Sequence, residues 1–406
     1  MSMKTILIIG GGHAGAQAAA SLRSDGFDGR VILVSAETEL PYHRPPLSKA
    51  FIKTADEELQ ELRPALFYEK NGIDLELGRK AVGIDRAAGE LLLEDGKLAF
   101  DAMVLAPGAR VRIPPVPGID LGNVFMLRTA EDARRLRERF AVAKDVVVVG
   151  GGFIGLELAA TARLLGKTVT VLEAAPRLMG RVVAPQISAF FLDLHRGFGS
   201  TVLTETSVKA ILGEDGAAVA VETLAGERIA ADTVIVGVGV VPNIELASEA
   251  GLAVANGITV DEAMRTSDPR IVAAGDAVEF HHWQLGRTVR LESVQNAVDQ
   301  AKTASATLMG KAEPYRAVPW FWSDQGDVKL QMVGLSNDAD RSVLRGRPED
   351  GSFSVFHYRG DLLVAIDSVN RGADHMLGRR LLAACTSPTP EQVADPGFDL
   401  KTLMTR

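Results

Sequence analysis

Two glycine-rich turns with identical spacing are the parts of this sequence best suited to chemistry. One, GGGHAG, begins at Gly10, and the other, GGGFIG, begins at Gly150. In a G-x-G-x-x-G turn the first glycine allows the tight bend, the second lets the backbone approach a pyrophosphate, and the third lets the helix pack on its strand. The N–H groups and the dipole at the start of that helix favour the anion. The spacing therefore predicts two dinucleotide sites in one chain.

The elements around both turns support this interpretation. Apolar residues 5–9 predict a buried strand and residues 14–22 predict a helix, and the same strand–turn–helix pattern restarts at Val146. A second strand follows each turn, and we assign Glu37 and Glu173 as the acids at the ends of these two strands. A carboxylate at that place accepts hydrogen bonds from the ribose hydroxyls of a dinucleotide.

Two dinucleotides in one chain predict electron transfer between them. We expect FAD at the first turn and a nicotinamide dinucleotide at the second, with hydride passing from the nicotinamide to the flavin. The Glu173 carboxylate would repel the 2′-phosphate of NADPH, which favours NADH. Arg177 and Arg181 lie close to it in the sequence, so the use of NADPH stays open.

Composition restricts the remaining possibilities. The chain of 406 residues is 47% hydrophobic, carries a net charge of -8 and has 1 cysteine, Cys385. An acidic chain is not expected to bind nucleic acid non-specifically. A lone cysteine allows no internal disulfide, no CxxC pair and no cysteine zinc site, so electrons are not expected to leave through a disulfide. Since no apolar run approaches the roughly 20 residues of a membrane span, we expect a cytoplasmic protein without membrane association.

The repeated βαβ pattern predicts an α/β fold with two Rossmann-like dinucleotide-binding domains and a C-terminal α+β domain. We expect a discontinuous FAD-binding domain over residues 1–109 and 241–318, with an NAD-binding domain inserted over 110–240. From residue 319 to 406 short strands and turns replace the βαβ pattern, which indicates the third domain.

Several longer motifs occur in a fixed order after the first glycine turn: RPPLSK, VLAPGAR, AAGDAVEF, LESVQNAVDQAK and PWFWSDQG. With them the chain resembles, over essentially its whole length, the FAD-dependent, NADH-linked ferredoxin reductases of bacterial oxygenase systems, the putidaredoxin reductase type. The resemblance implies a glutathione-reductase-like fold with a C-terminal interface domain. It also implies that electrons pass singly from the flavin to a 2Fe-2S ferredoxin that feeds a monooxygenase or ring dioxygenase.

Other functions share this fold and stay open at this point. A rubredoxin reductase or an NADH oxidase would use the same cofactors with a different electron acceptor. A flavin-bound signalling protein of the apoptosis-inducing-factor type is a third alternative, but such proteins usually carry long basic insertions that this chain lacks.

The resemblance implies which residues contact the cofactors. Lys49 matches the lysine beside the flavin, and Glu157, which we expect in the first turn of the helix after Gly150, is its ion-pair partner; these two form the expected catalytic pair. Asp276 matches the ribityl-binding aspartate. The expected FAD-contacting residues are Gly10, Gly12, Ala14, Gly15, Ala36, Glu37, Lys49, Val82, Arg128, Asp276, Val294 and Trp322. The expected NAD-contacting residues are Gly150, Gly152, Ile154, Gly155, Glu173 and Gly239.

Two residues depart from the family's pattern. Pro107 stands where a threonine is usual, and a proline removes one backbone donor from the FAD site. Ala36 stands where relatives often have an acid, with Glu37 one position further on.

A ferredoxin partner of this kind is acidic, so a chain with a net charge of -8 needs a local basic patch for docking. Arg63 and Lys302 are the expected docking residues, and the weaker candidates are Lys329, Arg379 and Arg380. We expect a monomer or a weak dimer. The pair His281-His282 has no evident third ligand, so we expect a surface loop there and no metal.

Overall fold

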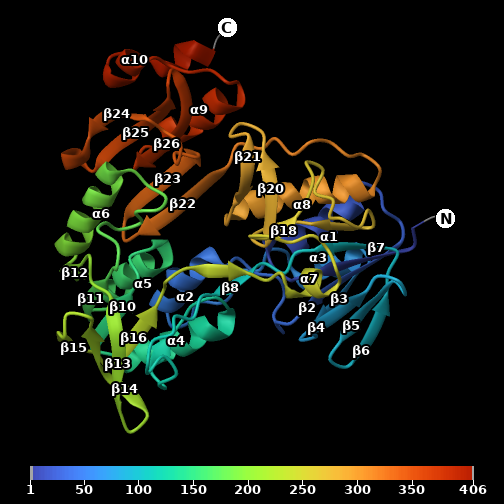
Figure 1. Ribbon diagram of the computed structural model, residues 1–406, viewed down its shortest axis with the longest axis horizontal. Helices are drawn as coiled ribbons and strands as arrows, with labels where there is room; N and C mark the ends of the chain where they lie inside the picture. Colours follow the sequence, from blue (N-terminus) through green and yellow to red (C-terminus); the bar gives the residue numbers. More distant parts are fainter. Residues whose placement is uncertain (1–2, 405–406) are drawn as a thin grey trace. The chain divides into compact units, whose positions relative to one another are not determined.

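The computed structural model describes residues 3–404, which divide into two compact units. The first unit joins the residues before Arg44 to Leu59–Arg110 and Val240–Ala317, and the second joins Arg44–Glu58, Val111–Gly239 and the residues from Val318 on. Figure 1 shows blue, cyan and yellow-orange segments gathered in the first unit. Its elements are β1 (Thr5–Ile9), α1 (His13–Ser24), β2 (Arg30–Ser35), α3 (Ala65–Lys70), β3 (Ile73–Leu77), β4 (Ala81–Asp85), β5 (Glu90–Leu93), β6 (Gly96–Ala99), β7 (Ala102–Leu105), α7 (Glu245–Glu249), β18 (Ile258–Thr259), β19 (Ile271–Ala273), β20 (Val278–His282), β21 (Arg287–Arg290) and α8 (Val294–Leu308).

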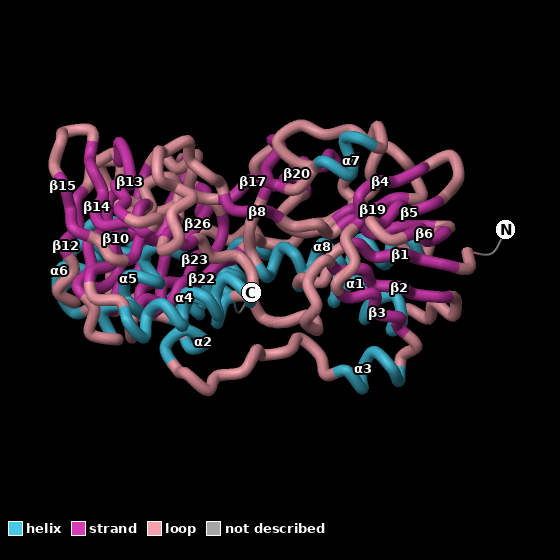
Figure 2. The backbone as a smooth tube through the Cα atoms, turned by 90° about the horizontal axis from the view of Figure 1, so that it is seen from below, coloured by secondary structure: helices cyan, strands magenta, loops and turns pink. Residues whose placement is uncertain are grey.

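A parallel sheet in the order β19-β7-β1-β2-β3 forms the centre of the first unit. Nearly every residue of β1 and β7 is buried, because helices cover a parallel sheet and its strands are apolar on both faces. Helices α1 and α8 lie side by side in both views (Figures 1 and 2), and Ser305 donates a hydrogen bond to the carbonyl of Ala18 between them.

The carboxyl ends of these parallel strands meet at one edge of the sheet. The turn at Gly10 follows β1, the segment Ala106-Pro107-Gly108 follows β7, and Gly275-Asp276 follows β19. Strand β1 pairs with β2 on one side and with β7 on the other. From β1 the chain therefore continues toward one edge of the sheet, through β2 and β3, and later returns to add β7 and β19 on the other side. Such a switch point is where parallel α/β sheets bind ligands.

The prediction of a surface loop at His281-His282 is wrong. These residues end β20, which pairs with β21 in a small sheet, and the His282 side chain is buried between Phe280 and Trp283. Burial lowers the pKa of His282 to about 4, so this histidine is neutral at pH 7. The paired histidines misled the prediction because one side chain of the strand points outward while the next is buried.

Apart from β17 (Val240–Pro242), which begins the last segment of the first unit, and β8 (Ala109–Val111), which spans the boundary at Arg110, the second unit holds the remaining elements. They are η1 (Pro45–Ser48), α2 (Ala50–Lys53), β9 (Val124–Phe125), α4 (Ala130–Val142), β10 (Asp145–Val149), α5 (Phe153–Leu164), β11 (Thr168–Leu172), α6 (Pro185–Gly197), β12 (Thr201–Leu203), β13 (Val208–Glu214), β14 (Ala217–Thr223), β15 (Arg228–Ala230), β16 (Thr233–Val236), β22 (Trp320–Gln325), β23 (Val328–Gly334), β24 (Arg341–Arg347), η2 (Pro348–Asp350), β25 (Ser352–Arg359), β26 (Leu362–Val369), α9 (Gly372–Ala383), α10 (Pro390–Ala394) and η3 (Leu400–Met404).

Two five-stranded sheets organise this second unit. The parallel sheet has the order β12-β11-β10-β16-β9, and β10 stands in it where β1 stands in the first unit. The other sheet is antiparallel, in the order β22-β23-β26-β25-β24, and α9 packs on β23 and β26. Within residues 3–404 no helix combines the length and the apolar character needed to cross a bilayer.

The segment Arg44–Glu58 belongs to the second unit, although the predicted domain boundaries place it within residues 1–109. The hydroxyl of Thr161 in α5 donates to the carbonyl of Ser48 at 2.9 Å, and the guanidinium of Arg137 in α4 lies 4.4 Å from the ring centre of Phe51. These contacts attach the loop, and Lys49 with it, to α4 and α5 of the second unit.

Acid should destabilise the C-terminal sheet through His375. This histidine of α9 is 1% exposed, its ring contacts Trp320, and burial followed by the charge of Arg379 lowers its pKa to about 4. The unfolded chain binds the same proton near pH 6.5, so stability is fully present above pH 6.5 and is lost as pH falls toward 4.

The variant His375→Phe keeps an aromatic ring beside Trp320 but has no group that titrates. Between pH 7 and pH 4.5 we expect its free energy of unfolding to fall by about 2–3 kcal/mol less than that of the unchanged protein. Thermal unfolding followed by circular dichroism at the two pH values measures this. Equal losses in both proteins would show that His375 does not carry the acid sensitivity.

Candidate functional site

The first glycine turn has one open position between two closed ones. Gly10 has a φ of +115°, and a β-carbon there would lie 2.1 Å from the carbonyl oxygen of Ala106; at Gly15 it would lie 1.9 Å from the Gly10 oxygen. At Gly12, by contrast, a β-carbon would meet no atom of residues 3–404 within 4 Å. Gly12 is also the N-cap residue of α1, and no side chain caps this helix start, which leaves room for a pyrophosphate to do so.

The second turn repeats this geometry in the other unit. Gly150 has a φ of +109° and its β-carbon would lie 2.5 Å from the Gly237 oxygen, and Gly155 is closed by the Gly150 oxygen at 2.4 Å. Gly152 is again the open position, with its nearest neighbour at 3.9 Å, and it begins α5 without a side-chain cap. The exposed side chain of Ile154 follows it in the first turn of α5.

Glu173 is fixed beside the second turn. Its Oε2 accepts the backbone N–H of Gly151 at 2.6 Å and its Oε1 accepts that of Ala175 at 2.7 Å. Each carboxylate oxygen keeps a further lone pair for a ribose hydroxyl. Gly239, the other predicted residue of this site, lies in the short connection after β16 and has a φ of +102°.

The strand register shows that the two turns differ at this acid. The N–H of Gly10 bonds the carbonyl of Val34, and the N–H of Gly150 bonds that of Leu172 at the same 2.8 Å. Ser35 is therefore the counterpart of Glu173. Ala36, which is exposed, and Glu37, which accepts the hydroxyl of Tyr42, come one and two residues later.

The two arginines near Glu173 are not equivalent. The guanidinium of Arg177 donates to the carbonyls of Val183 and Gly180, both at 2.6 Å, and to the hydroxyl of Ser188 at 3.0 Å. These bonds use three of the five N–H donors of the guanidinium and hold the loop before α6. Arg181 is exposed.

The turn Gly275-Asp276 is held from α8. The N–H of Gly275 donates to Gln300 Oε1 at 2.8 Å, while the buried Nε2 of Gln300 has no partner among the described residues. Asp276 is half-buried within a fully buried run, and the methyl group of Ala14 would be the nearest atom to a β-carbon on Gly275. The turn therefore lies against the first glycine turn, with a buried amide donor left for a ligand or water.

Three further residues of the first unit were predicted to contact FAD or to alter its site. Val294 is the first residue of α8, whose start is capped by the hydroxyl of Ser293. Val82 in β4 presents an exposed apolar side chain, which suits contact with a flat ring. Pro107 cannot donate, and its carbonyl accepts the amide of Asn243 at 2.9 Å, so the substitution leaves this loop anchored.

Lys49 and Glu157 form the ion pair that the resemblance implies. Lys49 Nζ lies 2.7 Å from Glu157 Oε2, and the two side chains are 22% and 7% exposed. The hydroxyl of Ser48 donates to Oε2 at 2.5 Å and that of Ser323 donates to Oε1 at 2.7 Å. Glu157 is the fifth residue of α5, so it lies at the start of the second turn, about one residue beyond the predicted first turn.

Ser48 and Ser323 were missed by the sequence analysis. Ser48 directly precedes Lys49, and Ser323 lies in the FWSDQ motif beside Trp322, so both stood in segments already singled out. Serine types alone carry little signal, since most serines are surface residues. Both became recognisable only once α5 and β22 were seen to enclose a carboxylate.

The two other predicted FAD residues also lie in this unit. Trp322 is on the face of β22 opposite Ser323, where an open pocket is lined by Trp320, Trp322, Asp324, Lys329 and Gln331. Arg128 precedes α4, and its backbone is held on both sides: its N–H donates to Asp132 and its carbonyl accepts Arg44.

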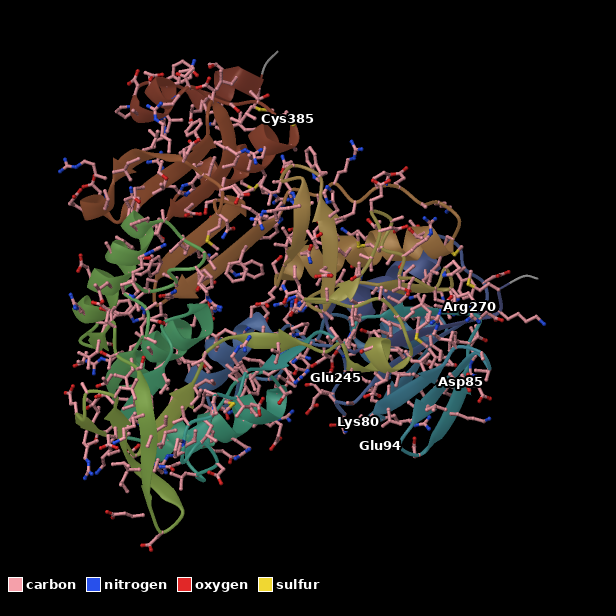
Figure 3. All side chains as sticks on the ribbon, in the orientation of Figure 1. Lys80, Asp85, Glu94, Glu245, Arg270 and Cys385 are labelled. Atoms are coloured by element: carbon pink, nitrogen blue, oxygen red, sulfur yellow. The ribbon has the colours of Figure 1, made fainter. Side chains whose placement is uncertain are left out.

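The two cations predicted to bind the ferredoxin already make contacts within the chain. Lys302 is exposed but pairs with Asp299 on its own helix at 2.9 Å, and Arg63 is half-buried over the ring of Phe67. Of the weaker candidates, Arg379 covers the ring of Trp320 at 4.8 Å, Lys329 lines the pocket beside Trp322, and Arg380 is exposed on α9. Cys385, labelled in Figure 3, is exposed on the C-terminal domain.

Comparison with known proteins shows the family of this chain. Residues 4–301 match the model of the pyridine nucleotide-disulphide oxidoreductase family and residues 320–404 that of the reductase C-terminal domain. Rhodocoxin reductase from Rhodococcus erythropolis is 48% identical, over 99% of this chain and 95% of its own.

Two solved structures share the whole fold. A ferredoxin reductase from Rhodopseudomonas palustris superposes with a TM-score of 0.96 at 48% identity, over 98% of this chain and 99% of its own. The reductase in the covalent putidaredoxin reductase–putidaredoxin complex superposes with a TM-score of 0.95 at 40% identity, over 99% and 98%. The predicted α/β class, with two parallel-sheet dinucleotide-binding domains and a C-terminal domain, is thereby confirmed. The chain belongs to the pyridine nucleotide-disulphide oxidoreductase family and, within it, to the ferredoxin reductases.

Proposed function

We propose that this protein takes hydride from NADH onto FAD and passes the electrons singly to a 2Fe-2S ferredoxin of an oxygenase system. The observation that carries this is the duplicated glycine turn, with an open second glycine beside a helix start in each copy. Bound FAD would accept two electrons as hydride and release them one at a time. The chain is an FAD- and NAD(P)H-dependent oxidoreductase; the preference for NADH is the finer part of the proposal.

The first unit supplies most of the residues proposed for FAD, while Lys49, Arg128 and Trp322 belong to the second unit. The backbone of the Gly10 turn would hold the pyrophosphate, Asp276 the ribityl hydroxyls, and the N-terminal end of α8 at Val294 the flavin ring. In the second unit the Gly150 turn and Glu173 would hold the pyrophosphate and ribose of the nicotinamide.

We assign Lys49 and Glu157 to the hydride step. A nearly buried carboxylate needs a counter-charge, and Lys49 supplies it at 2.7 Å. In return Glu157 holds the ammonium in one position, so that its positive charge favours electron gain by the flavin. Neither residue has to exchange a proton for this role.

The electron acceptor is proposed to be an acidic ferredoxin in the cytoplasm, with the reductase as a monomer or weak dimer. The single cysteine, exposed Cys385, offers no route through a redox disulfide, so an external acceptor is required. A rubredoxin or oxygen would also accept electrons, and a comparison of acceptors separates these alternatives.

Binding of FAD is tested at Gly12, because its open side allows a variant that folds. Gly12→Ala should leave the thermal stability of the cofactor-free protein within about 0.5 kcal/mol, since the added methyl group meets no protein atom. It should weaken FAD binding at least tenfold, because the methyl group occupies the space of the pyrophosphate. Flavin fluorescence during titration measures the affinity, and Gly197→Ala in α6, also open, is the matched control. Unchanged FAD affinity in Gly12→Ala would place the pyrophosphate elsewhere.

The choice of nicotinamide is tested at Glu173. Glu173→Gln removes the charge and keeps one oxygen, which can accept the backbone N–H of either Gly151 or Ala175 but not of both. We expect the ratio of kcat/KM for NADH to that for NADPH to fall about tenfold, because repulsion of the 2′-phosphate is lost. A preference for NADPH in the unchanged protein would contradict the assignment. Steady-state rates with ferricyanide as acceptor give both values.

Docking of the ferredoxin is tested by charge reversal at Lys302 on α8 and at Arg63 before α3. Lys302→Glu and Arg63→Glu should slow cytochrome c reduction through an added ferredoxin about tenfold at low salt, while NADH–ferricyanide activity stays within twofold. Lys97→Glu, which reverses another ion-paired lysine of the same unit, is the control for charge alone. If the ferredoxin rate is unaffected in both variants, docking occurs elsewhere; if no ferredoxin accelerates cytochrome c reduction, the proposed acceptor is wrong.

A further inference from the structure

A continuous chain of hydrogen bonds leads from a buried histidine to Glu157. His195 Nε2 lies 2.8 Å from Gln325 Oε1, Gln325 Nε2 lies 3.3 Å from Ser323 Oγ, and Ser323 Oγ lies 2.7 Å from Glu157 Oε1. His195, Gln325 and Ser323 are fully buried, and Glu157 is 6% exposed. The chain starts in α6, follows one face of β22 and ends in α5, so it joins the inserted nucleotide-binding domain to the C-terminal sheet within the second unit.

The acceptor character of Glu157 determines the direction of every bond in this chain. A carboxylate cannot donate, so the hydroxyl of Ser323 must give its only proton to Glu157. Ser323 Oγ can then only accept from Gln325, which requires the NH₂ group of the amide to face it. The Gln325 oxygen therefore faces His195, and His195 must carry its proton on Nε2.

The surroundings of the chain agree with this direction. His195 Nδ1 has no partner within residues 3–404, as expected of the unprotonated nitrogen, and burial lowers the pKa of this histidine. Its ring contacts Phe198, and the second contact of Gln325 Nε2 is the sulfur of Met179 at 3.8 Å; both are neutral. The charged group in contact with Glu157 is Lys49.

We propose that His195 is a positioning residue for hydride transfer: its Nε2–H orients the Gln325 amide, which commits the Ser323 proton to Glu157 and so holds the carboxylate that pairs with Lys49. The inference rests on the role proposed above for Lys49 and Glu157. If His195 carried its proton on Nδ1, the amide would turn over, and the Ser323 hydroxyl would be drawn away from Glu157 toward the Gln325 oxygen.

The tautomer of His195 tests the direction without reference to activity. In the FAD-loaded protein labelled with ¹⁵N-histidine, we expect the His195 signals to show a protonated Nε2 and a bare Nδ1 at pH 7 and above. The spectrum of His195→Gln, in which these signals are missing, assigns them. A dominant Nδ1–H tautomer would overturn the proposal, whatever the enzymatic activity of the protein.

Rescue by a matched side chain tests the effect on the reaction. His195→Gln places an amide donor near the former Nε2, whereas His195→Leu has a similar size and no donor. We expect His195→Leu to lower the rate of flavin reduction at saturating NADH about fivefold with the apparent KM for NADH within twofold, and His195→Gln to recover most of that rate. His357→Gln, at another buried histidine of the same unit that bonds Ser342 and Asp367, should leave the rate within twofold.

The outcomes separate this proposal from the function on which it rests. Equal rates for His195→Leu and the unchanged protein would overturn the positioning role while hydride transfer stands. Equal losses in His195→Leu and His195→Gln would assign the effect to packing and overturn it as well. If NADH does not reduce the flavin of the unchanged protein, the proposed function fails, and the tautomer alone then decides the direction of the chain.

Discussion

Glu157 is a negative charge held almost out of water, and the contacts that satisfy it join three parts of the second unit. An isolated buried carboxylate would cost several kcal/mol. Here one lysine and two hydroxyls satisfy it, and they come from two stretches far apart in the chain, the RPPLSK loop and β22, while the carboxylate itself belongs to α5. The carboxylate therefore requires the loop, the nucleotide-binding domain and the C-terminal sheet to meet at one place.

The two glycine turns illustrate how one steric rule can serve two sites. Gly10 and Gly150 each need a positive φ beside a neighbouring carbonyl. Strands β1 and β10 therefore end at equivalent positions relative to the strands beside them. Beyond that shared geometry the sites differ in one register position, where Ser35 faces the first turn and Glu173 faces the second. An acid is thus built into the strand end of the second site and not of the first.

Sequence patterns were sufficient where the cause of structure is local. Apolar β-branched runs before glycines predicted β1 and β10, and the lysine–glutamate pair followed from motifs of a known family. Sequence patterns did not predict the features that depend on strand register or on packing between segments distant in the chain. Glu37 looked equivalent to Glu173 because both follow a strand, and only the pairing of Ile9 with Val34 shows the two-residue offset. His282 and His195 gave no sign of burial, since their environments are made by elements distant in sequence.

The side chains of β22 point alternately to two sides of the strand, and each side has a different role. Phe321, Ser323 and Gln325 point to α5 and α6, while Trp320, Trp322 and Asp324 line the open pocket. Because side chains alternate strictly along a strand, a shift by one residue would bring tryptophans against Glu157 and expose the serine and the glutamine. The buried polar chain therefore fixes the register that also presents Trp322, so the support of the ion pair and the placement of the aromatic face depend on the same strand pairing.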